Sequence, residues 1–272
     1  MEEKELKRLL DEVKEIAVAA GEAILKVSSD DADVSIKTDG SPLTRADTTS
    51  QKVIQLRIEG LEPVFPVVSE EGNPEEASQG ELARYWLIDP LDGTKEFIKG
   101  IGEYTVNIAL VEGGVPVLGV IYIPVAGTLY YAGEGLGAWK VERDKEPSII
   151  YCSEAGQLKT AVVSRSHLSV ETEEFLLRLG VSNTIKHGSS LKMCAVAEGS
   201  ADIYPRFGPT CLWDTAAGTA IARQAGCAVV DLEGKGLLYN PAVGLKHFGF
   251  MVYPVKLSSI VSKHSTPEVK DV

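Results

Sequence analysis

The sequence lacks the excess of basic residues that would suggest a nucleic-acid partner. Its 272 residues include 27 basic and 39 acidic side chains, which give a formal net charge of −12. Proteins that bind nucleic-acid polymers need lysine and arginine for the phosphates, so we expect no such partner. A small phosphorylated metabolite is compatible with the acidity, because a few local cations or bound metals can reverse the local field.

Cysteines are few and widely spaced along the chain. The four are Cys152, Cys194, Cys211 and Cys227. No two fall within the C-x-x-C spacing of a zinc knuckle, so the sequence does not indicate a zinc site. All four have apolar or small neighbours, and we predict reduced thiols that pack as small hydrophobic side chains. This usage is typical of a reducing, cytoplasmic compartment.

Long apolar runs are also missing. Residues 1–10 are densely charged, and no apolar segment of the kind found in a secretory signal follows them. The longest uncharged stretch, residues 113–133, contains prolines and glycines among β-branched and aromatic residues. That composition predicts strands and turns rather than a membrane span. We therefore expect a cytoplasmic protein with no membrane-spanning segment.

The first half of the chain combines helices with antiparallel strands. Apolar residues recur every three or four positions over residues 3–27, which predicts an amphipathic helix. A second helix is expected over residues 44–59, because Thr44 and Asp47 form a Ser/Thr-x-x-Asp/Glu start signal. Short strands are expected at residues 34–37, 64–68 and 85–88, and the glycine turns within residues 104–139 predict an antiparallel meander.

The second half alternates strands with helices, which is an α/β pattern. Strands are expected at residues 161–164, 184–186 and 228–230 and near residue 203, and helices at residues 170–179, 189–197 and 214–224. The length and the change of pattern suit two lobes. We predict an α+β N-terminal lobe (residues 1–150) with most of the metal ligands and an α/β C-terminal lobe (residues 151–272) with the substrate-binding residues. A frayed tail is expected at residues 265–272.

Two aspartates that follow a predicted buried strand suggest a metal site. Asp89 and Asp92 lie in the run Asp-Pro-Leu-Asp-Gly, where proline fixes φ and glycine permits a tight turn. Such a turn would aim both carboxylates the same way, and close carboxylates repel each other unless a cation lies between them. Oxygen ligands of this kind suit Mg²⁺. The alternative is an aspartate-stabilised turn without a metal.

Other acidic residues lie where they could join this pair. Glu70 and Glu71 follow the preceding predicted strand, and Asp214 stands at the expected start of a helix. Asp214 could instead be the N-cap of that helix, and Asp47 could be a solvent-exposed acid within the second helix. The residues alone leave these alternatives open.

Two longer motifs resemble the signatures of the inositol monophosphatase superfamily of magnesium-dependent, lithium-sensitive phosphatases. They are Trp-Leu-Ile-Asp-Pro-Leu-Asp-Gly-Thr at residues 86–94 and Trp-Asp-Thr-Ala-Ala-Gly at residues 213–218. The family expects Gly-Gly or Gly-Ala further on, whereas here Cys227 follows Gly226, a departure that we expect to affect packing only. The resemblance covers about residues 5–254 and implies an α/β fold, the layered α-β-α-β-α sandwich of that superfamily, with the site between the lobes.

Shorter features resemble one subfamily, the CysQ-type 3′(2′),5′-bisphosphate nucleotidases. They include Lys-Glu-Phe at residues 95–97, where inositol monophosphatases usually have Thr-Asn-Phe, together with residues 39–44, 188–192 and 197–207. This resemblance implies hydrolysis of 3′-phosphoadenosine 5′-phosphate to AMP and phosphate, with 3′-phosphoadenosine 5′-phosphosulfate as a further candidate substrate. The competing prediction is an inositol 1-phosphate or fructose 1,6-bisphosphate phosphatase on the same scaffold.

The resemblance also implies the metal ligands. Glu70, Asp89 and the backbone carbonyl of Leu91 are expected to hold one Mg²⁺. Asp89, Asp92 and Asp214 are expected to hold a second, and a third, weaker ion is expected near Glu70. Mn²⁺ is expected to substitute, and Li⁺ or Ca²⁺ to inhibit. Two such ions clamp the attacking and leaving oxygens of an in-line displacement, with water as the nucleophile.

Catalytic residues follow from the same matches. Thr94 is expected to orient or deprotonate the attacking water, with Asp47 as its partner, and Glu70 completes the catalytic set. Gly93 and Thr94 are expected to donate backbone N–H groups to the phosphate, as turns that open into a helix do.

Substrate contacts are expected from the second half of the chain. Ser189, Ser190, Lys192 and Arg206 match positions that in the nucleotidases meet the ribose and the second phosphate. His167 is a candidate for contact with the base or a phosphate. Lysine and arginine suit an anion, although surface charge and a structural histidine are the alternatives.

The residues of the motifs argue against two other classes of protein. A non-catalytic metal-binding or nucleotide-binding protein is expected to lack a ligand or Thr94, and none is missing. A structural oligomer module would not need five acids at one site. We therefore predict a phosphomonoesterase that acts as a monomer or a homodimer.

Overall fold

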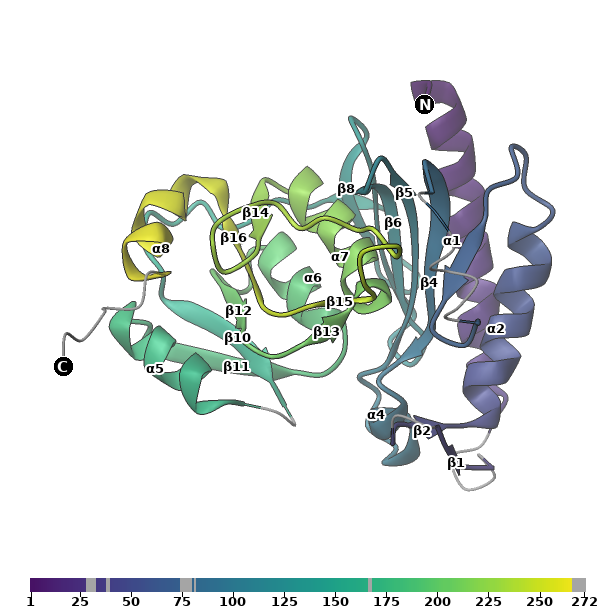
Figure 1. The fold of residues 1–272 in the computed structure, drawn as a ribbon, viewed down its shortest axis with the longest axis horizontal. Helices are drawn as coiled ribbons and strands as arrows, with labels where there is room; N and C mark the ends of the chain where they lie inside the picture. The colour runs from purple at the N-terminus through teal and green to yellow at the C-terminus, as the bar shows by residue number, and fades with distance from the viewer. Residues whose placement is uncertain (28–32, 38–39, 74–79, 81, 166–167, 266–272) are drawn as a thin grey trace.

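Two helices cover one face of a large sheet. The computed structural model describes residues 1–27, 33–37, 40–73, 80, 82–165 and 168–265. α1 (Glu3–Leu25) turns a buried apolar stripe toward the sheet, and α2 (Arg45–Ile58) lies beside α1 (Figure 1). Thr44 is the N-cap of α2 and forms a capping box with Asp47, which confirms the predicted start signal.

The large sheet has seven strands that follow one another in chain order. They are β3 (Val67–Ser69), β4 (Arg84–Asp92), β5 (Thr105–Glu112), β6 (Val115–Ile123), β7 (Thr128–Gly133), β8 (Gly137–Val141) and β9 (Ser148–Ile149). β3 pairs with β4 in parallel, and the later neighbours pair antiparallel. The predicted meander is therefore confirmed.

Two helices lie between the large sheet and a smaller one (Figure 1). α7 (Leu212–Gln224) packs on the large sheet, and α6 (Leu191–Ala197) packs against α7 and the smaller sheet. The approach of α7 is close, because a Cβ on Gly119 of β6 would lie 2.3 Å from the carbonyl oxygen of Ala217. Only glycine fits at this position, so the packing fixes α7, which includes Asp214, against the large sheet.

The smaller sheet is built from the second half of the chain. β12 (Tyr204–Arg206), β16 (Phe250–Pro254) and β14 (Cys227–Val230) pair antiparallel in that order. A bridge between Ala161 and Ile203 joins them to the parallel pair β10 (Thr160–Ser164) and β11 (Asn183–His187). α5 (Val170–Arg178) and α8 (Ser258–Ser265) lie outside this sheet. The layers thus alternate helix, sheet, helix, sheet, helix (Figure 1), which confirms the predicted fold.

Three apolar cores hold these layers together. One lies beneath α1 and α2, a second lies between the two sheets around α6 and α7, and a third lies beneath α5 and α8. Burial of apolar surface is the main favourable term in folding. The middle core takes residues from both halves of the chain. We propose that the two lobes divide near residue 150, just after β9, and share this middle core.

Several short elements complete the fold. β1 (Ser35–Ile36) pairs with β2 (Pro42–Leu43), and β13 (Thr210–Cys211) pairs with β15 (Lys246–His247). The five-residue helix α4 (Thr94–Ile98), the 3-10 turn Val255–Leu257 and α8 were not predicted. The strand expected from residue 64 begins only at Val67. Most of the predicted tail, residues 266–272, lies outside the described residues.

The cysteines and the helix lengths agree with the predictions from composition. All four cysteines are free thiols, and Cys194 and Cys227 are buried. Within the described part of the chain, every helix is too short or too polar to cross a lipid bilayer.

Candidate active site

The end of β4 places two predicted ligands at one edge of the large sheet. The register between β4 and β5 shifts between Asp89 and Asp92, so the strand bulges there. Leu91 N donates a hydrogen bond to Asp89 Oδ1 at 3.0 Å, and Ser50 Oγ donates to the Pro90 carbonyl at 2.7 Å. The aspartate-stabilised turn is therefore present. It uses one oxygen of the Asp89 carboxylate.

Three carboxylates from separate segments meet beside this turn. One oxygen each of Glu70, Asp89 and Asp214 lies within 4.8 Å of the other two, and we name these residues the carboxylate cluster. Glu70 follows β3, and the parallel pairing of β3 with β4 brings it to the same edge as Asp89. Asp214 reaches the cluster from the first turn of α7. The structure therefore brings together three of the four predicted acidic ligands.

The helix start around Asp214 differs from the prediction. α7 begins at Leu212, and its N-cap is Cys211. Cys211 N donates a hydrogen bond to Asp214 Oδ2 at 3.1 Å. The predicted N-cap alternative for Asp214 is therefore wrong, because its side chain reaches back to the N-cap from the third helical position. One oxygen of Asp214 serves the helix, and the carboxylate still borders the cluster.

The carboxylate cluster is electrostatically unfavourable without a cation. Burial, followed by the charges of Glu70, Asp92 and Asp214, raises the pKa of Asp89 well above its usual range. Burial and the charges of Asp92 and Glu70 likewise raise the pKa of Asp214 well above its usual range. Burial also raises the pKa of Asp92, although the Lys192 charge and the Ser189 hydrogen bond oppose this shift. A divalent cation would relieve this repulsion.

The donor atoms fit a hard divalent cation such as Mg²⁺. Carboxylate and carbonyl oxygens are its preferred protein ligands. The acidic residues also bind a positively charged side chain at the edge of the site. Lys37 Nζ lies 2.7 Å from Glu70 Oε1 and 2.5 Å from Glu71 Oε1. The carbonyl of Leu91, the predicted backbone ligand, accepts a long hydrogen bond of 3.4 Å from Thr94 Oγ1.

Thr94 and Asp47 are joined as predicted. Thr94 Oγ1 donates a hydrogen bond to Asp47 Oδ1 at 2.9 Å. Asp47 is 1% exposed, so the alternative of a solvent-exposed acid is wrong, because the first turn of α2 lies against Thr94. The other Asp47 oxygen accepts hydrogen bonds from Thr44 N at 2.8 Å and Thr44 Oγ1 at 2.5 Å. The capping box therefore orients the carboxylate toward Thr94.

Gly93 connects β4 to α4 in a conformation that other residues resist. Its φ is 100°, in the left-handed region. A Cβ there would also lie 3.2 Å from the carbonyl oxygen of Glu103 and from Tyr104 Cβ. Glycine therefore lets the backbone turn directly from Asp92 into the first turn of α4.

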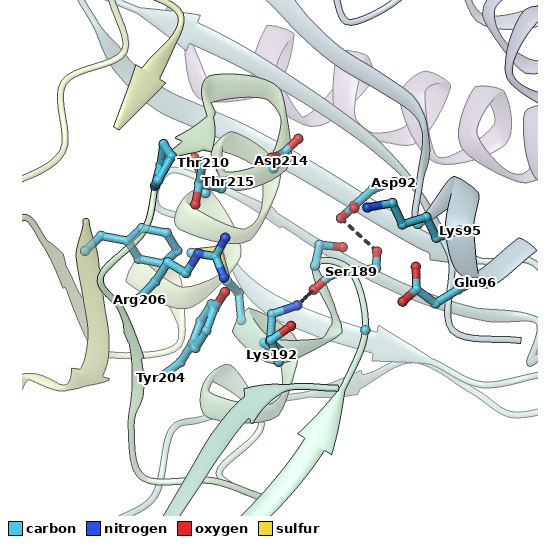
Figure 2. A pocket seen from close by; sticks show the side chains of 17 residues that line it. Asp92, Lys95, Glu96, Ser189, Lys192, Tyr204, Arg206, Thr210, Asp214 and Thr215 are labelled. Atoms are coloured by element: carbon cyan, nitrogen blue, oxygen red, sulfur yellow. Dashed lines mark hydrogen bonds between the residues drawn. The ribbon is translucent and has the colours of Figure 1, made fainter. Parts of the chain in front are cut away.

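A cavity of about 190 Å³ borders these residues. Asp92, Gly93 and Asp214 line it, together with the predicted substrate contacts Ser189, Ser190, Lys192 and Arg206. Figure 2 shows the guanidinium of Arg206 pointing into the cavity, across from Asp92. Lys192 is only 8% exposed, so the surface-charge alternative is wrong for this residue. Burial lowers the pKa of Lys192, and the Asp92 charge opposes that shift.

Thr105 and Asn107 of β5 form hydrogen bonds with the cavity serines Ser189 and Ser190. Neither residue of β5 was predicted from the sequence. Thr105 Oγ1 lies 2.7 Å from Ser189 Oγ and 2.8 Å from Ser190 Oγ. Ser190 Oγ donates to Asn107 Oδ1 at 2.9 Å. Ser189 Oγ also donates to Asp92 Oδ2 at 2.8 Å (Figure 2). Polar residues two positions apart on an apolar strand share a face, and that spacing was the available signal.

The features that favoured the nucleotidase subfamily also reach the cavity. Lys95 and Glu96 line it from α4, and Gly188 lines it from the segment before α6. His167 lies outside the described residues, so its contact with a substrate stays a prediction.

The chain matches the model of the inositol monophosphatase family over residues 5–248. It is 47% identical over 255 residues to the 3′(2′),5′-bisphosphate nucleotidase CysQ of Escherichia coli strain K12, which covers 90% of this chain and 99% of the relative. The protein of the same name from Buchnera aphidicola is 42% identical over 240 residues, which cover 86% of this chain and 88% of the relative. Among solved structures, CysQ from Bacteroides thetaiotaomicron has a TM-score of 0.77 and 40% identity, and covers 92% of this chain and 97% of its own. The Thermotoga maritima IMPase has a TM-score of 0.77 at 26% identity, with 95% and 96% covered.

Proposed function

The chain belongs to the inositol monophosphatase family, and we propose from this premise that it is a 3′(2′),5′-bisphosphate nucleotidase. The proposed reaction converts 3′-phosphoadenosine 5′-phosphate and water to AMP and inorganic phosphate. The oxygen of water bonds to phosphorus, the bond from phosphorus to the ribose 3′ oxygen breaks, and that oxygen leaves with a proton. Relatives at 47% and 42% identity bear the nucleotidase name, which supports this substrate class.

One observation supports a substrate with two phosphates. Asp92 and Asp214 give the cavity an acidic side and Lys192 and Arg206 a cationic side, while Lys95 and Glu96 add one charge of each sign beside Asp92. A phosphate at the acidic side needs metal ions, whereas a phosphate at the cationic side is matched by lysine and by the bidentate geometry of arginine. We place the ribose between them, beside Ser189 and Ser190.

The metal requirement follows from the family and from the donor set. We propose that Glu70, Asp89 and the Leu91 carbonyl hold one Mg²⁺, and that Asp89, Asp92 and Asp214 hold a second. A third, weaker ion near Glu70, substitution by Mn²⁺ and inhibition by Li⁺ or Ca²⁺ belong to the same proposal. When bound, such ions act as Lewis acids and lower the pKa of water.

The residues of the chain position the water and the phosphate. The hydroxyl of Thr94 donates a hydrogen bond to Asp47. The lone pairs of Thr94 Oγ1 can therefore accept a hydrogen bond from the attacking water. Thr44 fixes the other oxygen of Asp47 and thereby this orientation. The backbone N–H groups of Gly93 and Thr94 are the proposed donors to the phosphate that is transferred.

The competing functions use the same scaffold. Inositol 1-phosphate has one phosphate and would leave the cationic side formed by Lys192 and Arg206 without an anion. Fructose 1,6-bisphosphate has two phosphates and is therefore the stricter comparison. A non-catalytic binding protein is disfavoured, because Thr94 keeps its hydrogen bond to Asp47 beside an intact carboxylate cluster.

The test is phosphate release from the three substrates by the purified protein loaded with Mg²⁺. We expect the highest kcat/KM on 3′-phosphoadenosine 5′-phosphate, loss of activity with a chelator, and its return with Mg²⁺. Asp92→Asn should abolish activity, whereas the matched change Asp144→Asn at an exposed turn should not. A higher kcat/KM on either competing substrate would refute the proposed substrate.

A further inference from the structure

A set of hydrogen bonds joins the two halves of the chain beside the cavity. Glu103, between α4 and β5, accepts hydrogen bonds from Arg165 Nε at 2.8 Å and Arg165 Nη2 at 2.6 Å. Gly188 N donates to the same carboxylate at 2.8 Å, and His187 Nδ1 lies 3.4 Å from it. We name Glu103, Arg165 and Gly188 the Glu103 clamp.

The Glu103 clamp favours a single geometry. The two-pronged contact with Arg165 fixes the orientation of the carboxylate. Hydrogen bonds from Arg165, and after it from Gly188 and His187, lower the pKa of Glu103 to about 2, so the group is ionised at neutral pH. A Cβ on Gly188 would lie 3.0 Å from the Glu103 carbonyl oxygen and 3.3 Å from Glu96 Cγ. The segment at Gly188 is therefore held close to Glu103 by hydrogen bonds and by shape.

The clamp holds the residue that connects the two sides of the cavity. Ser189 follows Gly188 directly and has a φ of 51°, which is unusual for a residue with a side chain. Its Oγ donates a hydrogen bond to Asp92, and its carbonyl oxygen accepts one from Lys192 Nζ (Figure 2). The position of Ser189 therefore sets the spacing between Asp92 on the acidic side and Lys192 on the cationic side.

We propose that Glu103 and Arg165 are positioning residues that select substrates with two phosphates, an inference that rests on the proposed function. The described residues that line the cavity do not include either of them, so they act through Gly188 and Ser189. Without the clamp, Ser189 relaxes from its strained conformation and Lys192 loses its fixed acceptor. The second phosphate then loses a positioned cation, whereas the phosphate that is transferred keeps the carboxylate cluster and Thr94.

The experiment compares two substrates that differ only in the second phosphate, 3′-phosphoadenosine 5′-phosphate and adenosine 3′-phosphate. Glu103→Gln should raise KM for the bisphosphate about tenfold, the loss expected for charge-assisted hydrogen bonds, and change kcat less than about threefold. The values for adenosine 3′-phosphate should stay close to those of the wild type. The control is Glu112→Gln, which removes an Arg84–Glu112 pair of the same 2.6 Å length on the large sheet. This control should leave both substrates unaffected.

A second variant, at the other residue of the ion pair, shows whether the effect of Glu103→Gln comes from misfolding. Arg165 is 41% exposed, so Arg165→Gln should keep the melting temperature near that of the wild type and reproduce the selective rise in KM. The double variant should be no worse than Glu103→Gln alone, because both changes break one clamp. If KM rises equally for the two substrates, or if folded variants keep the wild-type preference between them, the proposed role of the Glu103 clamp is wrong and the proposed function is unaffected. A wild-type enzyme that ignores the second phosphate would instead refute the proposed function and the clamp with it.

Discussion

Replacing Thr94 with alanine tests the proposed activation of water. The hydroxyl of Thr94 lies 2.9 Å from Asp47 Oδ1, and Asp47 is 1% exposed. Alanine removes the group that is proposed to accept the proton or hydrogen bond of the attacking water. It leaves the carboxylate cluster in place, because the hydroxyl binds Asp47, outside the cluster, and its contact with the proposed ligand Leu91 is long, at 3.4 Å.

The expected loss is large because a positioned proton acceptor contributes about 10²–10⁴-fold to a rate. Thr94→Ala should therefore lower kcat by about 10²–10⁴-fold, equivalent to roughly 3–5 kcal/mol of activation free energy. KM and the Mg²⁺ concentration for half-maximal activity should change little. The matched control is Thr94→Ser, which keeps the hydroxyl and should retain kcat within about tenfold.

The assay is steady-state phosphate release at saturating Mg²⁺, with metal content measured for each variant. If Thr94→Ala retains more than about a tenth of the wild-type kcat while it binds the metal normally, the hydroxyl does not activate the water. If the variant loses the metal, the contact with the Leu91 carbonyl matters more than its length suggests. Either result would refute this reasoning.

Three further predictions concern the anion, the metal and pH. Lys192→Met should raise KM for 3′-phosphoadenosine 5′-phosphate by roughly 10- to 100-fold but leave adenosine 3′-phosphate nearly unchanged, and equal losses would argue against a second-phosphate site. Millimolar Li⁺ should inhibit phosphate release in competition with Mg²⁺, and full activity in Li⁺ would count against the metal assignment. The metal-free protein should become less stable as pH rises above about 4, as measured by its melting temperature. The raised pKa values of Asp89 and Asp214 mean that the folded state holds more protons than the unfolded state. That stabilisation is complete below the pKa that these aspartates have in the unfolded chain. It is lost as the pH rises through the higher pKa values that they have in the folded protein. Saturating Mg²⁺ should remove most of this dependence, and a pH-independent melting temperature without metal would contradict it.

The elements with local signals were predictable from the sequence. The apolar periodicity of α1, the capping box of Thr44 and Asp47, and the glycine turns of the meander all act over a few residues. The layered fold followed from the resemblance of two motifs to a family, and the metal ligands proposed here rest on the same resemblance. The α4 helix was missed because five residues are too few to show a helical period.

The contacts that hold Ser189 and Gly188 at the site could not be predicted, because they join distant segments. Ser189 and its partner Asp92 are 97 residues apart, and Gly188 and Glu103 are 85 residues apart. The contact of Asp47 with Thr94, which is 47 residues further on, was expected from the family resemblance alone, because the helix position of Asp47 says nothing about Thr94. Such contacts depend on how the layers pack rather than on any local pattern.

The central claim is that carboxylates from separate segments bind divalent ions at one site. Crystals of the protein soaked with Mn²⁺ and measured near the manganese absorption edge would test it directly. We predict at least one strong anomalous peak within bonding distance of Glu70, Asp89 and Asp214. A well-ordered site without an anomalous peak, in crystals that diffract well enough to show these side chains, would contradict the account.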